Sequence, residues 1–307
     1  MGGRRKVAVF GVPSAAGGRH PAQAEAPNHL RAAGLLEALR GAGLRVVNLS
    51  DLSLFPYRDD PEHPRARNAE VVACAVRATA DEMTRALGEG FTLVLGGDCT
   101  LVAGVVGGAW AALGQPVGLV YLDANADLNT PETSPSGFLS GMALALALGR
   151  AGGAVAATPS PAVLPEHVAL VGYRELDPGE RRPLGDLGLA LPAAAAKALG
   201  MRTTAALALD AVANADGPVV VHLDVDLIDP GEMPAKESYT PGPNAPGGSG
   251  GPGLTWTEAS DLVTALLASP RVAAFLVCEY QPARDPDLVY GRRLVELIAR
   301  AVSRHFR

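Results

Sequence analysis

The sequence DANAD at residues 123–127 and the sequence DVD at residues 224–226 each place paired aspartates at the end of an apolar run. The preceding runs begin at Val117 and Val219 and have the length and composition of buried strands. Such carboxylate pairs are typical of oxygen-rich metal sites, yet none of the six histidines falls in either pair. The acids therefore indicate a metal site of unusual ligand type or one that has lost its metal.

Short apolar runs alternate with stretches of helical spacing along the rest of the chain. The predicted strands are Val7–Val12, Val46–Leu49, Phe91–Leu95, Val117–Leu122, Val168–Val171, Val219–Val225 and Val272–Cys278. The predicted helices are Ala32–Ala42, Asn68–Leu87, Leu101–Leu113, Ala143–Leu148, Ala193–Leu199, Thr203–Ala213, Thr257–Leu267 and Asp287–Arg304. Uniformly apolar strands separated by helices predict a parallel sheet covered on both faces. No linker divides the chain, so we expect one domain over residues 1–307.

Composition narrows the class of protein. The mild net charge of −6 argues against a nucleic-acid partner. The sequence contains no stretch of about 18 apolar residues, so we predict no membrane span. The chain starts without the pattern of a signal peptide, and its three cysteines suit free thiols in a reducing cytosol, with Cys74 and Cys278 expected in the core. The Gly- and Pro-rich segment 241–253 is predicted to be a loop. We expect a cytoplasmic enzyme without nucleic-acid or membrane partners.

In parallel sheets, sites form outside the carboxyl ends of the strands, where both aspartate pairs fall. Five segments in this order resemble the signature regions of the arginase/agmatinase (ureohydrolase) family, and their details resemble its arginase branch. They are GGDCT (96–100), DANADLNTPETSPSGFLSG (123–141), VGYRELDPGE (171–180), HLDVDLIDP (222–230) and CEYQPARD (278–285). The resemblance implies a three-layer α/β/α sandwich around a mainly parallel eight-stranded sheet, assembled as a trimer or hexamer. It also implies hydrolysis of guanidino or related C–N bonds with a manganese pair.

The metal positions are matched unevenly. Four residues match the metal-binding aspartates of the family: Asp123, Asp127, Asp224 and Asp226. Cys99 and Asn125 stand where the resemblance implies the two histidine ligands, and Ser140 stands where it implies a proton-shuttling histidine. The chain thus resembles an atypical member that lacks all three functional histidines.

The substrate positions are matched in part. Glu279 matches the glutamate that receives the guanidinium, and Phe138 replaces an amide side chain beside the substrate α-carboxylate. Other matched groups surround the α-amino end and the α-carboxylate of the substrate: Asp177 and Glu180, and Asn129 and Ser136. Asp177 and Glu180 also suit a turn with a helix-capping acid.

Three residues keep alternative interpretations. Cys99 is a soft metal ligand, a nucleophile at a helix N-terminus, or a small residue that fills the space of an imidazole. Asn125 is an oxygen ligand or a hydrogen-bonding spacer between acids. His222 falls on the same side of its strand as Asp224. It is either a base beneath the acids or a buried histidine whose ring hydrogen-bonds to the backbone.

The clustered acidic residues determine the predicted function. Carboxylates this close repel one another by about 3 kcal/mol per pair, so they demand a cation: manganese, or zinc, iron or magnesium. We predict an atypical C–N hydrolase acting on a guanidino- or amine-bearing small molecule, with Asp127 and Glu279 in catalysis and little activity on L-arginine. The alternative is a metal-free homologue, either a silent partner subunit or a repurposed biosynthetic enzyme.

Overall fold

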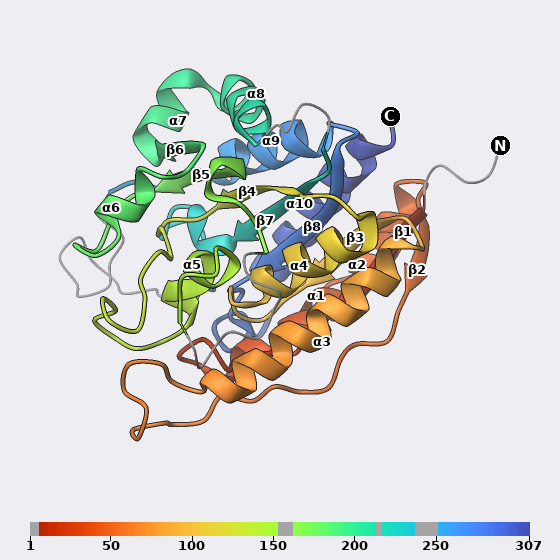
Figure 1. Ribbon diagram of the computed structural model, residues 1–307. Helices are drawn as coiled ribbons and strands as arrows, with labels where there is room; N and C mark the ends of the chain where they lie inside the picture. Colours follow the sequence, from red (N-terminus) through yellow and green to blue (C-terminus); the bar gives the residue numbers. More distant parts are fainter. Residues whose placement is uncertain (1–5, 153–161, 213–216, 237–250) are drawn as a thin grey trace.

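The computed structural model describes residues 6–152, 162–212, 217–236 and 251–307 (Figure 1). Eight strands form one parallel sheet in the order β2-β1-β3-β8-β7-β4-β5-β6. Their bounds are β1 Lys6–Gly11, β2 Arg45–Asn48, β3 Phe91–Leu95, β4 Gly118–Leu122, β5 Val168–Tyr173, β6 Leu189–Pro192, β7 Val219–Asp224 and β8 Val272–Cys278. The predicted α/β fold with a parallel eight-stranded sheet is confirmed.

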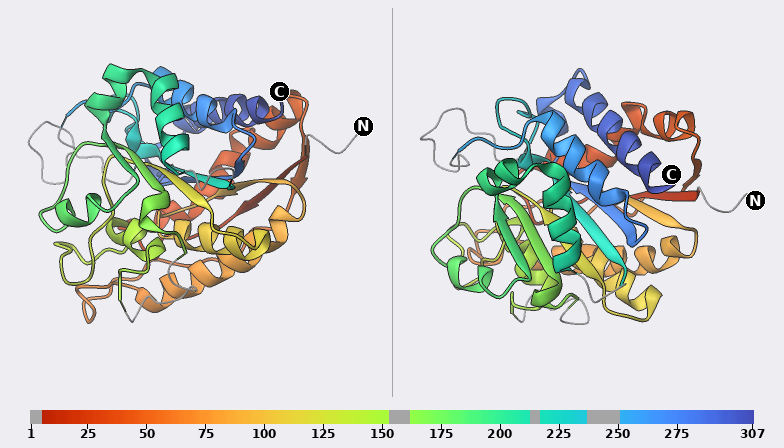
Figure 2. Two further views of the ribbon diagram at one scale, coloured as in Figure 1. Left: turned by 45° about the horizontal axis from the view of Figure 1, so that its top comes forward. Right: turned by 90° about the horizontal axis from the view of Figure 1, so that it is seen from above.

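Helices cover both faces of the sheet (Figures 1 and 2). One face carries α3 (Ala69–Leu87), α4 (Leu101–Leu113) and α5 (Ala143–Ala147). The other face carries α1 Ala26–Ala32, α2 Leu35–Gly41, α7 Ala193–Leu199, α8 Met201–Ala211, α9 Trp256–Leu267 and α10 Val289–His305. The short helix α6 spans Arg181–Leu184. Among the described residues, no helix is long and apolar enough to cross a membrane.

The alternation of side chains along the strands explains the two cores. On β1, Val7 and Val9 pack against the α10 side, whereas Ala8 and Phe10 pack against the α3 side. Because both faces are covered, every residue of β3, β4 and β7 is buried. Continuous apolar runs are the sequence pattern that such central parallel strands require. The polar residues that follow these strands are therefore held on a rigid edge.

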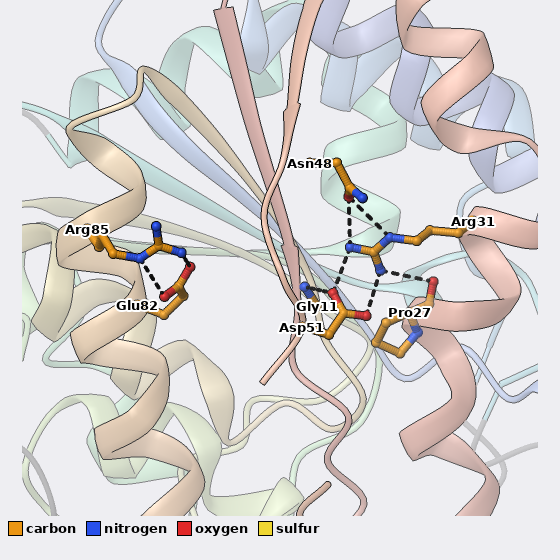
Figure 3. A network of polar contacts seen from close by, with 7 residues as sticks. All are labelled: Gly11, Pro27, Arg31, Asn48, Asp51, Glu82 and Arg85. Carbon is orange, nitrogen blue, oxygen red and sulfur yellow. Dashed lines mark hydrogen bonds and ion pairs between the residues drawn. The ribbon is translucent and has the colours of Figure 1, made fainter. Parts of the chain in front are cut away.

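A polar network away from the sheet centre fixes the chain where β1 ends (Figure 3). The guanidinium of Arg31 on α1 pairs with the carboxylate of Asp51 at 2.7 Å, and the same carboxylate accepts the Gly11 N–H at 2.7 Å. A Cβ at Gly11 would lie 2.6 Å from the Asp51 carboxyl carbon, so only glycine permits this approach. The loop that leaves β1 toward the cavity described below is thereby anchored at its start.

The structure corrects several sequence expectations. The helix predicted over Ala32–Ala42 begins later, as α2 at Leu35, because the chain turns at Gly34 with a φ of 95°, and the preceding helix α1 was not predicted. Strand β6 was not predicted; it lies at the sheet edge, and all four of its residues are only partly buried. Cys74, expected in the core, is exposed on α3, whereas Cys278 is buried as expected. The loop predicted over 241–253 lies outside the described residues up to position 250.

Candidate functional site

A cavity of about 420 Å³ opens at the carboxyl edge of the central strands. Most of its wall comes from residues that the sequence predicts for the site: Cys99, Asn125, Asp127, Asn129, Ser136, Phe138, Ser140, Asp177, Glu180, Asp224, Asp226 and Glu279. Asp123, the remaining predicted residue, is buried beside them. Segments far apart in the sequence thus converge because β3, β8, β7 and β4 are neighbours in the sheet.

The aspartates form one compact group. Oxygen atoms of Asp123, Asp224 and Asp226 lie within 4.8 Å of one another. An oxygen of Asp127 also lies within 4.8 Å of an Asp123 oxygen and of the Cys99 sulfur. All four aspartates are at most 6% exposed. The strand ends place these side chains, since Asp224 is the last residue of β7 and Asp123 directly follows β4.

Backbone donors hold one oxygen of three of these carboxylates. Asp123 Oδ1 accepts the Asn125 N–H at 2.7 Å, Asp224 Oδ1 accepts the Asp226 N–H at 2.7 Å, and Asp226 Oδ1 accepts the Ala124 N–H at 3.0 Å. Asp123 Oδ2 is buried and has no hydrogen-bond partner among the described residues. The fixed backbone turns therefore aim the remaining oxygens at a shared space.

Burial and mutual repulsion set the protonation of the group. Burial, with Asp127, Asp224 and Asp226 nearby, raises the pKa of Asp123 well above its ordinary value. Burial and the neighbouring Asp226 likewise raise the pKa of Asp224. Such groups take up protons on folding, so each costs stability as pH rises above the ordinary carboxyl range.

Replacing Asp123 with asparagine is therefore expected to stabilise the metal-free protein. The raised pKa of Asp123 means that its stability contribution is complete below about pH 4 and is lost as pH rises through the folded-state value. The Asp123→Asn gain in melting temperature should accordingly be small at pH 4 and grow toward pH 8. Thermal unfolding in EDTA at both pH values tests this, with Asp81→Asn on the exposed side of α3 as control. An equal gain at both pH values would contradict the prediction.

Lys236 is the site residue that the sequence did not reveal. Its ammonium is buried, with the side chain 1% exposed, and lies 3.9 Å from Asp226 Oδ2. The backbone of Lys236 pairs with Tyr280, directly after Glu279, and the side chain lines the cavity. The acids therefore have a protein-borne cation beside them. The only sequence signal was that this lysine follows Asp229 by seven residues in an otherwise Gly- and Pro-rich stretch.

The surroundings of Cys99 oppose the nucleophile interpretation. The Cys99 thiol donates to Asp224 Oδ2 at 3.4 Å. Burial, a hydrogen bond with Cys278 and the charge of Asp224 raise the pKa of the Cys99 thiol well above its ordinary value. The thiol thus stays protonated in the metal-free protein and is a poor nucleophile there.

Glu279 and Asp127 are both held in the left-handed backbone region, with φ values of 67° and 51°. Such conformations are strained for residues other than glycine and concentrate at functional sites. The Glu279 carboxylate accepts the Cys99 N–H at 2.8 Å and the side-chain amide of Gln23. Asp127 Oδ2 accepts the Tyr121 hydroxyl at 2.5 Å. Gln23 and Tyr121 are two further site residues that the sequence did not single out.

The predicted substrate residues at the cavity rim hold one another. Glu180 accepts the Leu128 N–H at 3.0 Å and the Asp177 N–H at 2.8 Å, and the Asn129 side-chain amide donates to Asp177 at 2.8 Å. Burial raises the pKa of Glu180. The predicted turn is therefore present, but Glu180 at the N-cap of α6 makes no side-chain capping hydrogen bond. Both carboxylates line the cavity instead.

Two guanidinium groups flank the aromatic ring at the rim. Arg19 and Arg67 lie 5.0 and 5.1 Å from the centroid of Phe138, within the range of cation–π contacts. Arg19 also lines the cavity. Ser136 and Ser140 lie on the same loop, which the Ser140 N–H ties to the Gly17 carbonyl at 2.9 Å. The cavity rim thus combines the Arg19 guanidinium with the carboxylates of Glu175, Asp177 and Glu180.

The donor set fits one hard divalent cation. Asp123, Asp224 and Asp226 offer closely spaced oxygens, and the unpartnered Asp123 Oδ2 requires a positive neighbour. A second cation would depend on Cys99, Asn125 and Asp127, without the imidazoles that the resemblance implies. The residues present therefore do not reproduce the ligand set of a manganese pair.

Comparisons with known proteins agree with this geometry. Residues 5–304 match the model of the "Arginase family". The arginase of Bacillus subtilis is 29% identical over 300 residues, which cover 96% of both chains, and that of Bacillus caldovelox is 31% identical over 87% of this chain and 88% of its own. The solved structure of the Bacillus caldovelox arginase superimposes with a TM-score of 0.85 at 28% identity, covering 97% of this chain and 98% of that one.

Proposed function

The chain belongs to the arginase family, and on that basis we propose that it hydrolyses a C–N bond in a small guanidino- or amine-bearing molecule. The observation that carries this proposal is the acid-lined cavity, in which the predicted aspartates and Glu279 surround one space. A cationic head group entering this cavity would relieve the repulsion among the buried carboxylates.

Each group has a proposed task. Glu279, fixed by Cys99 and Gln23, binds and orients the guanidinium or amine, and Asp127 accepts a proton from the attacking water. When bound by Asp123, Asp224 and Asp226, one divalent cation would supply the Lewis acidity that makes water acidic near neutral pH. Manganese is the first candidate, with zinc, iron or magnesium as alternatives.

Ordinary arginase activity should be low. Ser140 lacks the titratable group of a proton shuttle, and loss of a general acid or base commonly costs about 10²–10⁴ in rate. Phe138 cannot offer the amide contact to an α-carboxylate that the family resemblance implies. Arg19, which lines the cavity beside Phe138, would favour a substrate whose anionic group is placed differently from that of L-arginine.

Lys236 supports a second candidate function. Because its ammonium supplies positive charge beside Asp226 without any metal, the cavity suits a metal-independent homologue, either a catalytically silent partner or a repurposed biosynthetic enzyme. We further propose that residues 1–307 form one domain, that the protein acts in the cytoplasm, and that it assembles as a homo-oligomer, either a trimer or a hexamer.

Metal analysis combined with a urea-release assay tests the proposal. Purified protein should bind about one manganese, lose activity toward a panel of guanidino compounds in EDTA, and regain it with Mn²⁺. Asp226→Asn should abolish both the manganese-dependent rise in melting temperature and the activity, because it removes a cation ligand. Activity that EDTA leaves unchanged would instead support the metal-independent enzyme, and a folded protein inert toward the whole panel would support the silent homologue.

A further inference from the structure

Three potential metal ligands lie directly beneath the acids. The sulfurs of Cys99 and Cys278 and a ring nitrogen of His222 are all within 4.8 Å of one another. They come from adjacent elements: Cys99 follows β3, Cys278 ends β8, and His222 lies in β7. The parallel register explains their meeting, since Asp224 pairs with Cys278 and His222 is two residues earlier on the same face.

His222 is the unusual member of this group. It is fully buried, and neither of its ring nitrogens has a hydrogen-bond partner among the described residues. The ring is stacked on Tyr121 with centroids 4.2 Å apart and planes 10° from parallel, which fixes its orientation. A buried polar group without a hydrogen-bond partner is energetically costly, and it is rare in folded proteins unless the group binds a water molecule or an ion.

We propose that Cys99, His222 and Cys278 form a binding site for one soft divalent metal ion, with Zn²⁺ as the expected occupant. Two thiolates and one imidazole are a known ligand set of catalytic zinc. In a tetrahedral site these atoms lie roughly 3.5–3.8 Å apart, and the observed separations of at most 4.8 Å are close to that spacing. The ion would give His222 the partner that it lacks.

The charge of the complex suits its buried position. Zn²⁺ with two thiolates and a neutral imidazole carries no net charge, so it can replace the uncharged thiols without burying an ion in an apolar core. A neutral imidazole and two deprotonated thiols are the forms that bind such an ion, so metal binding must release the thiol protons of Cys99 and Cys278.

The fourth coordination position would face the cavity. Asp224 Oδ2 lies 3.4 Å from the Cys99 sulfur, and both residues line the cavity wall, which gives an ion a way in. Asp224 or a water can complete the set. This site shares at most Asp224 with the hard-cation site of Asp123, Asp224 and Asp226, and it does not rest on the proposed hydrolysis.

Cobalt substitution tests the site on the full chain. Fully reduced protein titrated with Co²⁺ should develop an intense sulfur-to-cobalt charge-transfer band at one equivalent, and Zn²⁺ should displace it. Cys278→Ser and His222→Gln should each weaken Co²⁺ binding by more than about 100-fold, because even loss of a residue that only hydrogen-bonds a metal ligand commonly costs about 10–100-fold. Cys74→Ser, at the exposed cysteine on α3, is the matched control and should keep the band.

The hard-cation site is separated within the same experiment. Asp123→Asn should leave the charge-transfer band in place, because Asp123 is not a ligand of the soft site, while it weakens Mn²⁺ binding. Absence of the band in reduced wild-type protein would overturn the proposal even if the variants fail to fold. A band of full intensity in folded Cys278→Ser protein, checked by circular dichroism, would also overturn it.

Discussion

Replacement of Lys236 by methionine is expected to lower the free energy of unfolding of the metal-free protein by about 3–5 kcal/mol at neutral pH. The side chain is 1% exposed, and its ammonium faces the buried carboxylate of Asp226. Removing one partner of such a buried pair leaves the other charge uncompensated, here among several more carboxylates. Methionine keeps the length and apolar stem of the side chain, so the loss reports on the charge. Urea denaturation in EDTA measures it.

A second variant assigns the effect to the acids. Adding Asp226→Asn to Lys236→Met should recover much of the lost stability, because it removes the charge left without a partner. Lys197→Met is the matched control: its pair with Glu258 is 3.3 Å long but about 30% exposed on both sides, so it should cost less than about 1 kcal/mol. A Lys236→Met loss no larger than this control would refute the role of the buried ammonium.

The same variant bears on metal binding. If Lys236 supplies part of the positive charge that the acids need, Lys236→Met should bind Mn²⁺ more tightly than wild type, because the cation no longer competes with an ammonium. The stabilisation by a fixed Mn²⁺ concentration would then be greater in the variant.

The fold could be predicted from the sequence because the central strands are buried on both faces. Phe91–Leu95 and Val272–Cys278 were predicted with their observed bounds, since no charged residue interrupts them. The strand Leu189–Pro192 escaped because it lies at the edge, is partly exposed, and runs into the helix that begins at Ala193. The start of α2 was placed too early because the apolar spacing continues across the turn at Gly34.

The sequence predicted the site residues only where they directly follow strands. Asp123, Asp224 and Glu279 come directly at strand ends, so their convergence follows from topology alone. Lys236 lies outside any strand or helix, and its approach to the acids depends on an isolated pairing with Tyr280 that no local pattern indicates. Charge balance in a buried site thus depends on tertiary contacts that sequence spacing does not encode.

Replacement of Glu279 by glutamine is expected to lower kcat/KM for a cationic substrate by about 10²–10³, because loss of one partner of a buried charge pair commonly costs about 2–5 kcal/mol. The carboxylate is 3% exposed, lines the cavity and is held by the Cys99 N–H. If Glu279 orients the substrate for attack, kcat should fall as well as KM rise. Urea release from the best substrate of the guanidino panel measures both.

The fold should tolerate this change, which makes the kinetic result interpretable. The new amide would present an N–H₂ to the donating amide of Gln23, yet Gln23 Oε1 has no hydrogen-bond partner among the described residues. Rotation of the Gln23 amide by half a turn therefore restores a hydrogen bond between the two side chains. Glu175→Gln, on an exposed glutamate at the cavity rim, should cost far less, because solvent screens its charge. Equal losses in both variants would mean that the overall negative field of the cavity, rather than Glu279 itself, recognises the substrate.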